Sequence, residues 1–312
     1  MADKQRTIAK AVSLKGRGLH SGVEVEVTIK PAPENHGYQF KRMDIEGHPV
    51  IRALAEYVKL TERSTTIVDK GASITTVEHL LAALYGMGVD NAMMEIDGPE
   101  VPIIDGSAKP FVEAIRSAGI MKQAADRVYY QIREKIEFRD VEKGIELIAY
   151  PDDDLIIDVH IDYNSRVLGN QYASMKNISQ FEAEFSTCRT FVFLHELEFL
   201  QKNNLIKGGD LDNAIVIIDR MVSQEELDRL AKVLNKPRVK VKPEGILNNV
   251  DLSFANEPAR HKLLDVIGDL ALCGVRLQGR IIANKPGHHA NVEFAKIIRK
   301  RIKVSHNKPD VP

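Results

Sequence analysis

The sequence predicts an α+β fold built from layers of sheets and helices, and two observations lead to this class. Segments with the period of a strand and segments with the spacing of a helix occur in both halves of the 312-residue chain. In addition, the glycine-rich segment Gly16–Gly22 is followed by strict alternation from Val23 to Ile29, which predicts a strand. A dinucleotide-binding or phosphate-binding loop would open a helix at this point, so we interpret the glycines as a tight turn between strands.

The first half then continues with helices and strands in turn. Residues 75–86 have helical spacing, and Thr75 is the predicted cap. A strand is expected over 91–96 and a helix over 110–118. The pattern weakens around 120–128, where we place a domain boundary.

The second half repeats this mixture of elements. Its predicted strands lie near 128–138, 144–150, 156–163, 214–218 and 278–283, and its predicted helices cover 179–185, 191–202, 261–274 and a basic segment that begins near Asn291. The predicted division of the chain is residues 1–124, residues 125–300 and a basic or polar tail or linker over 301–312.

Composition limits the classes of function. A net charge of -1 gives no general attraction to nucleic acid, and 44% hydrophobic residues provide ample core. Two cysteines, Cys188 and Cys273, cannot form a disulfide framework. No signal peptide precedes the first strand, and no apolar run approaches the roughly 20 residues of a membrane helix. We therefore expect a cytoplasmic protein with reduced thiols.

The most informative segment is His261–Asp269, in which His261, Asp265 and Asp269 are four residues apart. On a helix these three side chains share one face, and the residues between them are mostly apolar. An imidazole and two carboxylates on a buried helix suit a metal site with a supporting acid. The ordinary alternative for His261 and Asp265 is a surface ion pair.

Elimination narrows the ten histidines to a few. His36, His48 and His306 lie in polar or charged surroundings, His160 is expected on a solvated strand face, and His20 is expected to have a structural role in a turn. His195-Glu196 begins a zincin-like pattern, but Phe199 stands where the second ligand belongs. His79 follows Glu78 on a predicted helix, and His288-His289 form a loop pair. The ordinary alternative for Glu78-His79 is a solvated helix face, and the ordinary alternative for His288-His289 is a loop pair without a function.

Together these segments resemble the zinc-dependent UDP-3-O-acyl-N-acetylglucosamine deacetylase family of lipid A biosynthesis over about residues 5–297. The resemblance rests on the following segments: Gly18–Gly22, Thr76–Leu80, Asp90-Asn91, Pro102–Ser107, Arg189–Phe191, Leu205–Ala214, His261–Asp269 and Gly287-His288.

The resemblance implies a metal site and an acid–base pair. In the family two histidines and one aspartate hold zinc, and these positions fall on His79, His261 and Asp265. Three protein ligands leave a position for water, as catalytic zinc requires. Glu78 matches the general base and His288 a second acid–base group.

Further site residues follow from the same resemblance. Asp269 matches the carboxylate partner of His288, and Thr190 matches a residue that stabilises the oxyanion. Lys262 is expected to face the substrate's diphosphate, and Tyr163 to stack on uracil. His289 follows His288 where a small residue is usual, so the choice between the two histidines stays open, although Gly287 favours His288.

The resemblance also implies an architecture of two α/β sandwich domains with the active site between them. The second domain carries a strand–helix–strand insert near 191–219 that forms an apolar passage for the acyl chain. Suitable linings, whose ordinary interpretation is core packing, are Phe191, Phe193, Leu197, Leu200, Leu205 and Ile206.

Two segments differ from the commoner form of the family. Phe193–Glu198 and the basic stretch Lys296–Lys303 resemble the form fused to a 3-hydroxyacyl-carrier-protein dehydratase, although nothing in these 312 residues resembles that dehydratase. The expected ligands are thus Zn²⁺ and an acylated UDP-N-acetylglucosamine, and the expected partner is a fused or adjacent dehydratase domain.

Two other classes of function compete with this interpretation. One is a non-catalytic protein that binds a nucleotide sugar or acts as a scaffold, but such a protein would not need Glu78 beside three metal ligands. The other is a metal-dependent phosphoesterase, which usually has more carboxylates and two metals. The basic run Lys236–Lys242 is interpreted as a solvated loop or edge strand, with weak peripheral attraction to anionic membrane lipids as the alternative.

Overall fold

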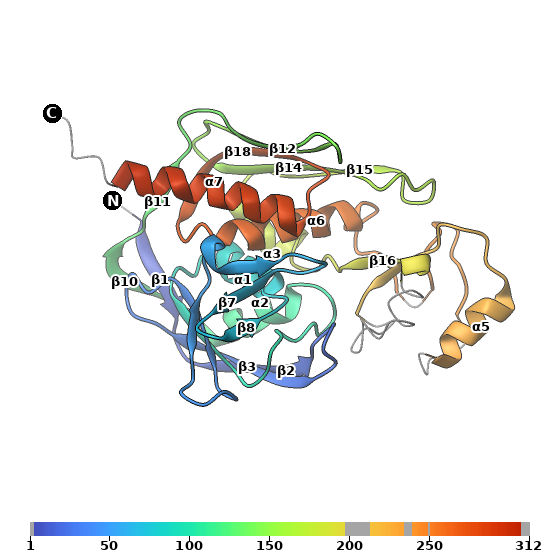
Figure 1. The fold of residues 1–312 in the computed structure, drawn as a ribbon, viewed down its shortest axis with the longest axis horizontal. Helices are drawn as coiled ribbons and strands as arrows, with labels where there is room; N and C mark the ends of the chain where they lie inside the picture. The colour runs from blue at the N-terminus through green and yellow to red at the C-terminus, as the bar shows by residue number, and fades with distance from the viewer. Residues whose placement is uncertain (1–2, 197–212, 234–238, 249, 307–312) are drawn as a thin grey trace.

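The computed structural model describes residues 3–196, 213–233, 239–248 and 250–306, and it has the predicted α+β class. Two main sheets lie on the outside of the molecule, and most of the helices lie between them (Figure 1). One large hydrophobic core joins the inner faces of both sheets to these helices.

The first half of the chain forms one main sheet and two smaller ones. Alternation on β3(Glu24–Pro31) buries Val25, Val27 and Ile29, as predicted, and the turn at Gly18–Gly22 links this strand to β2(Val12–Arg17). The five-stranded sheet has the order β2(Val12–Arg17), β3(Glu24–Pro31), β9(Ala92–Ile96), β4(Tyr38–Arg42), β5(Val50–Arg52). The smaller sheets consist of β6(Val58–Leu60), β7(Thr66–Asp69) and β8(Ala72–Ile74), and of β1(Lys4–Ile8) with β10(Ile120–Asp126).

The second half forms a six-stranded sheet around β18. Strict alternation on β14 buries Leu155, Ile157, Val159 and Ile161 against the helices. The order is β12(Ile136–Asp140), β13(Ile145–Tyr150), β18(Arg276–Asn284), β14(Leu155–Asp162), β15(Asn170–Met175), and β11(Tyr129–Gln131) also pairs with β18. A separate parallel pair consists of β16(Phe191–Phe193) and β17(Ile215–Ile217).

The helix α6 is central, because almost all of its side chains are buried. It packs on α1 from the first half and on α7 from the second. The helices are α1(Glu78–Gly86), α2(Lys109–Ala118), α3(Phe181–Glu184), α5(Gln224–Val233), α6(Glu257–Ala271) and α7(His288–His306), with short 3₁₀ turns η1(Ala55–Tyr57) and η2(Ile178–Gln180). Within the described ranges no helix has both the length and the apolar character needed to cross a bilayer.

Several predicted boundaries were wrong, each for a local reason. The helix predicted from residue 75 begins at Glu78, and Thr75 is not its cap because its hydroxyl bonds Thr66 instead. The weak pattern at 120–128 is β10, a strand whose side chains are largely exposed on both faces, so it shows little apolar alternation. The predicted division at 124/125 falls within this strand and remains a prediction.

The segment from residue 191 begins with a strand, as the resemblance implied, and the helix predicted over 191–202 was wrong at its start. Residues 191–193 form a strand and not the start of a helix. Leu197, Leu200, Leu205 and Ile206 lie outside the described residues. The helix α5 was not predicted, and with β16 and β17 it contributes to a second, smaller hydrophobic cluster, in the part of the molecule that projects to the right in Figure 1.

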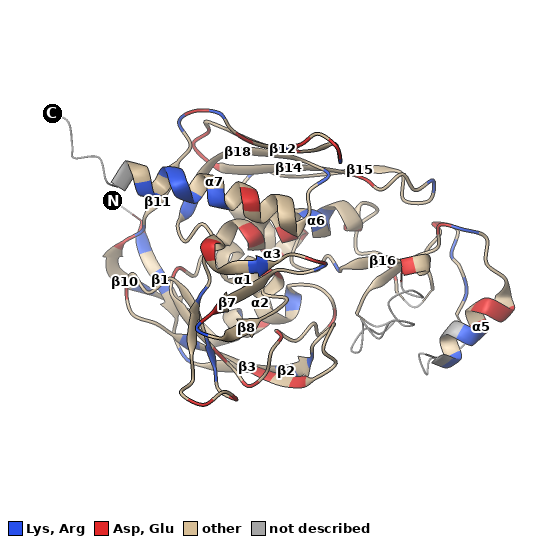
Figure 2. Ribbon diagram, viewed as in Figure 1, with Lys and Arg blue, Asp and Glu red and all other residues tan. Residues whose placement is uncertain are grey.

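The C-terminal helix starts earlier than expected and binds the first half through its basic residues. His288, predicted in a loop, is the first residue of α7. Lysine and arginine follow one another along the second part of this helix (Figure 2). Among them, Arg299 and Lys303 both pair with Glu56 of η1, at 2.6 and 3.2 Å. The basic stretch therefore includes cross-links between the two halves of the chain.

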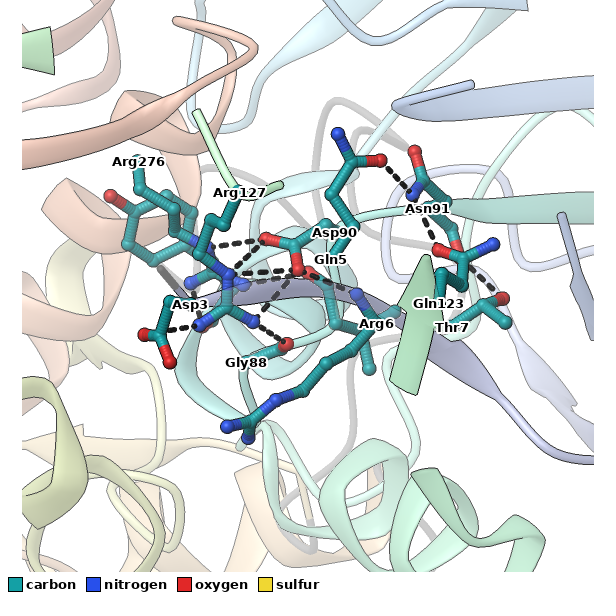
Figure 3. Close-up of polar contacts among 12 residues, drawn as sticks. Asp3, Gln5, Arg6, Thr7, Gly88, Asp90, Asn91, Gln123, Arg127 and Arg276 are labelled. Carbon is teal, nitrogen blue, oxygen red and sulfur yellow. Dashed lines mark hydrogen bonds and ion pairs between the residues drawn. The ribbon is translucent and has the colours of Figure 1, made fainter. Parts of the chain in front are cut away.

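A largely buried ionic cluster around Asp90 joins the two halves of the chain beside the C-terminal end of α1 (Figure 3). The Asp90 carboxylate accepts hydrogen bonds from the Arg127 Nη2 at 2.7 Å, the Arg276 Nε at 2.9 Å and the Arg6 backbone N–H at 2.8 Å. Arg276 also stacks on the ring of Tyr85. The charge of one carboxylate thus offsets the charges of two largely buried guanidinium groups from different parts of the chain.

Replacing Asp90 with asparagine should lower the free energy of unfolding by about 3–5 kcal/mol, because two buried cations lose their counter-charge. The measurement is urea denaturation of both proteins under identical conditions. Asp126→Asn is the matched control, since Asp126 pairs with Lys4 on the surface and its loss should cost less than about 1 kcal/mol. Equal midpoints for the two variants would contradict the prediction.

Candidate active site

The N-terminus of α1 places Glu78 and His79 in the interior. Thr76 lies two residues before the first residue of α1 and has a positive φ of 59°, which turns the chain sharply into the helix. This strained backbone is held by the Thr76 hydroxyl, which donates to the buried Glu100 carboxylate at 2.9 Å. Glu78 and His79 are both buried as a result.

The helices α1 and α6 approach closely at Gly268. A Cβ at this position would lie 2.1 Å from the carbonyl oxygen of Glu78, so no other residue fits without separating the helices. This contact brings the face of α6 that carries His261, Asp265 and Asp269 against the start of α1. The side chains that the spacing places on one face of α6 therefore lie against Glu78 and His79 from the other half of the chain.

His79, His261 and Asp265 form the only cluster of possible metal ligands found among the described residues, with their ligand atoms within 4.8 Å of one another. The Asp265 Oδ1 lies 3.4 Å from the His261 Nε2 and 3.8 Å from the His79 Nε2. All three side chains are buried. The geometry thus assembles two imidazoles and one carboxylate around a common point.

The chemistry of these groups fits a divalent metal. The buried Asp265 Oδ1 has no hydrogen-bond partner among the described residues. Burial lowers the pKa of His79 to about 3 and also lowers that of His261, so both rings are neutral. The His261 Nδ1 lies 3.0 Å from the carbonyl oxygen of Cys188, which fixes the Nδ1–H tautomer and leaves the Nε2 lone pair free.

Lys262 keeps Asp265 ionised. Burial alone would raise the pKa of Asp265, but the Lys262 ammonium at 2.8 Å holds it below its usual range. The Lys262 ammonium also lies 5.6 Å from the ring centre of Phe191. Two neutral imidazoles and an ionised carboxylate are a donor set typical of catalytic zinc.

Glu78 and His288 face each other beside this cluster. The His288 Nε2 lies 3.8 Å from the Glu78 Oε1, and the His288 Nδ1 lies 3.0 Å from the Asp269 Oδ2. Burial raises the pKa of Glu78 to about 7. Burial opposes the charge on His288, but Asp269 and Glu78 together raise its pKa to about 9. A carboxylate and an imidazolium therefore coexist near neutral pH.

A cavity of about 350 Å³ opens onto these groups. Its lining includes His79, His261, Asp265, Glu78, His288, Thr190, Lys262, Phe191 and Tyr163. Asp269 lies behind His288 and does not line the cavity. Phe191, Phe193 and Tyr163 contact one another edge-on or at a tilt along one wall. The structure thus brings together the ten residues predicted as metal ligands, catalytic groups and main substrate contacts, nine in the wall and one behind it.

The structure places His288 and His289, between which the sequence left the choice open, in different surroundings. His288 is buried in the cavity wall, whereas His289 is exposed and contacts Phe138 with ring centres 6.5 Å apart. His160, predicted on a solvated face, is instead half-buried: it stacks on Tyr172 and lies 2.6 Å from the Asn284 Oδ1. The exposed tyrosine covers the histidine, which strand alternation cannot predict.

His20 is a site residue that the sequence analysis missed. It lies in the predicted turn, but it also lines the cavity, and its buried Nε2 has no partner among the described residues. Its backbone N–H donates to Glu100 at 3.0 Å, which fixes the turn. The presence of His20 in a segment that carries the family resemblance was the available signal.

Comparisons with known proteins show the family of this chain. The family model described as LpxC, UDP-3-O-acyl N-acetylglycosamine deacetylase, matches residues 5–232 and 233–300. A UDP-3-O-acyl-N-acetylglucosamine deacetylase of Geotalea uraniireducens is 40% identical over 93% of this chain and 86% of its own length. One from Thermosynechococcus vestitus is 39% identical over 96% of this chain and 95% of its own.

Longer relatives are also similar. A bifunctional enzyme LpxC/FabZ of Porphyromonas gingivalis is 49% identical over 96% of this chain. The chain spans 65% of the length of that relative.

Proposed function

We propose that this chain, which belongs to the UDP-3-O-acyl N-acetylglycosamine deacetylase family, hydrolyses the N-acetyl group of an acylated UDP-N-acetylglucosamine to a free amine and acetate in lipid A biosynthesis. One observation carries the proposal. The unpaired carboxylate oxygen of Asp265 and two neutral imidazoles adjoin a buried Glu78–His288 pair in one cavity.

The metal in this proposal is zinc, held by His79, His261 and Asp265. When bound, it would supply the Lewis acidity that polarises the acetamide carbonyl and activates water. The His261 contact with Cys188 and the Lys262 contact with Asp265 orient two of the three ligands.

The chain's own residues supply the proton transfers. Glu78 accepts the proton of the attacking water, and the buried setting that raises its pKa makes it an effective base near neutral pH. His288, protonated at its Nε2 and held at its Nδ1 by Asp269, delivers a proton to the departing amine. Thr190, in the same wall, donates a hydrogen bond from its hydroxyl to the developing oxyanion.

The remaining cavity residues bind the substrate. Lys262 is assigned to the diphosphate, and Tyr163 is assigned to the uracil. Phe191, which contacts Tyr163, begins the apolar wall for the acyl chain. We further propose a cytoplasmic location, in keeping with the free, buried Cys188 and Cys273. The identity to bifunctional relatives leads us to propose that this deacetylase is of the type fused to a dehydratase.

The proposal is tested by acetate release from UDP-3-O-acyl-N-acetylglucosamine, with bound zinc counted per chain. We expect stoichiometric zinc and a kcat/KM far higher than for unacylated UDP-N-acetylglucosamine, because Phe191 and Phe193 form an apolar wall. Equal kcat/KM for both substrates would contradict the acyl-chain assignment. Phosphate release in place of acetate, or zinc without any turnover, would contradict the proposed reaction.

The pH dependence should be bell-shaped, because the reaction needs Glu78 ionised and His288 protonated. Asp269 raises the pKa of His288, so Asp269→Asn should lower it, and the alkaline limb should move to lower pH by about one unit or more. The measurement is kcat/KM against pH for both proteins. His289→Ala, outside the cavity, is the control and should leave the profile unchanged. An alkaline limb that does not move would assign it to another group.

A further inference from the structure

Thr65, the residue immediately before β7, is fully buried and contacts both members of the proposed acid–base pair. Its backbone N–H donates to the Glu78 Oε2 at 3.0 Å. Its hydroxyl donates to the Asp269 Oδ1 at 2.6 Å and lies 3.3 Å from the His288 Nδ1. One residue therefore holds the carboxylate of the base through its main chain and the partner of the acid through its side chain.

The contacts around Asp269 explain what the hydroxyl contributes. The Asp269 Oδ2 accepts from the Asn291 Nδ2 at 2.9 Å and faces the His288 Nδ1 at 3.0 Å. The Asp269 Oδ1 accepts from Thr65. With both oxygens engaged, the carboxylate cannot rotate freely, and the plane of the His288 ring is fixed relative to Glu78.

We propose that Thr65 is a positioning residue for the deacetylation: its hydroxyl orients Asp269 and thereby His288, while its N–H orients Glu78. The inference rests on the proposed function for its effect on turnover. Thr65 itself does not line the cavity, so it acts through these groups and not on the substrate.

The experiment compares two substitutions of the same residue. Thr65→Val keeps the shape and the N–H but removes the hydroxyl, and we expect kcat to fall on the order of 10–100-fold with KM and zinc content unchanged. Thr65→Ser restores the hydroxyl and should restore most of kcat. The matched control is Thr66→Val, which removes a neighbouring buried hydroxyl whose partner is Thr75 at 3.0 Å, and it should leave kcat near that of the unmodified protein.

A double-mutant cycle separates positioning from general destabilisation. If Thr65 acts through Asp269, then Thr65→Val should reduce kcat little further in the Asp269→Asn background. Additive losses, or equal losses in Thr65→Val and Thr65→Ser, would overturn the inference. So would a Thr65→Val enzyme with unchanged kcat.

A readout without turnover distinguishes failure of this inference from failure of the proposed function. The downfield proton resonance of the His288 Nδ1–H, assigned by its loss in His288→Gln, should shift or broaden in Thr65→Val and stay in place in Thr65→Ser and Thr66→Val. If the protein releases no acetate but the resonance responds in this way, the proposed reaction is wrong and Thr65 still orients the ring. If acetate is released and the resonance is unchanged in Thr65→Val, the positioning role is wrong.

Discussion

Replacing His261 with alanine should give a folded protein that holds no stoichiometric zinc and has no measurable deacetylase activity. In the proposed site His261 is one of three ligands, and its ring is already oriented by the carbonyl of Cys188. Without it, His79 and Asp265 are too few to retain a catalytic metal. Elemental analysis and acetate release on the same preparation provide the measurement.

His289→Ala is the matched control for this prediction, because it removes an imidazole outside the cavity and should keep both metal and activity. Circular dichroism and thermal melting would show that both variants are folded. Stoichiometric zinc retained in His261→Ala, or zinc found at another place in a structure, would contradict the assigned site.

Glu78→Ala should keep zinc and lose roughly 100-fold or more in kcat, as the loss of a general base commonly does. Glu78 adjoins the proposed ligand His79 in sequence, yet it lies outside the cluster of possible ligand atoms and faces His288 instead. Its removal therefore leaves the ligand set intact while the attacking water loses its proton acceptor. The measurements are kcat with the acylated substrate and zinc per chain.

Glu95→Ala serves as the control for Glu78→Ala, since Glu95 on β9 pairs with Lys30 and does not line the cavity. It should turn over at the rate of the unmodified enzyme. A Glu78→Ala protein with near-normal kcat would show that another group is the base, and one that has lost zinc would make Glu78 a ligand.

The spacing of residues on α6 could be predicted from the sequence because it depends only on local helical geometry. Four-residue intervals placed His261, Asp265 and Asp269 on one face, and the apolar residues between them indicated burial. The same spacing did not predict that Asp265 would face His79 and that Asp269 would face His288. That division depends on how two other elements dock against α6.

The contributions of loops were hidden from the sequence for a different reason. A single loop residue such as Thr65 has no periodicity, and the two partners of its hydroxyl, Asp269 and His288, are 204 and 223 residues away. Thr76, with its positive φ, shifted the start of α1 to Glu78 because tertiary contacts with Glu100 overrode the local preference for a threonine cap. Both positions are decided by the tertiary fold and not by local propensity.

The absence of a side chain at Gly268 has a consequence for how this enzyme could be recombined. The carbonyl of Glu78 occupies the place where a methyl group would otherwise stand, so the first half of the chain sets the position of the base against a surface of the second half. The proposed catalytic centre therefore forms where the two halves meet, and neither half contains it alone. Chimeras assembled from two homologues would have to preserve the close approach of Gly268 to Glu78 among the contacts between the two halves.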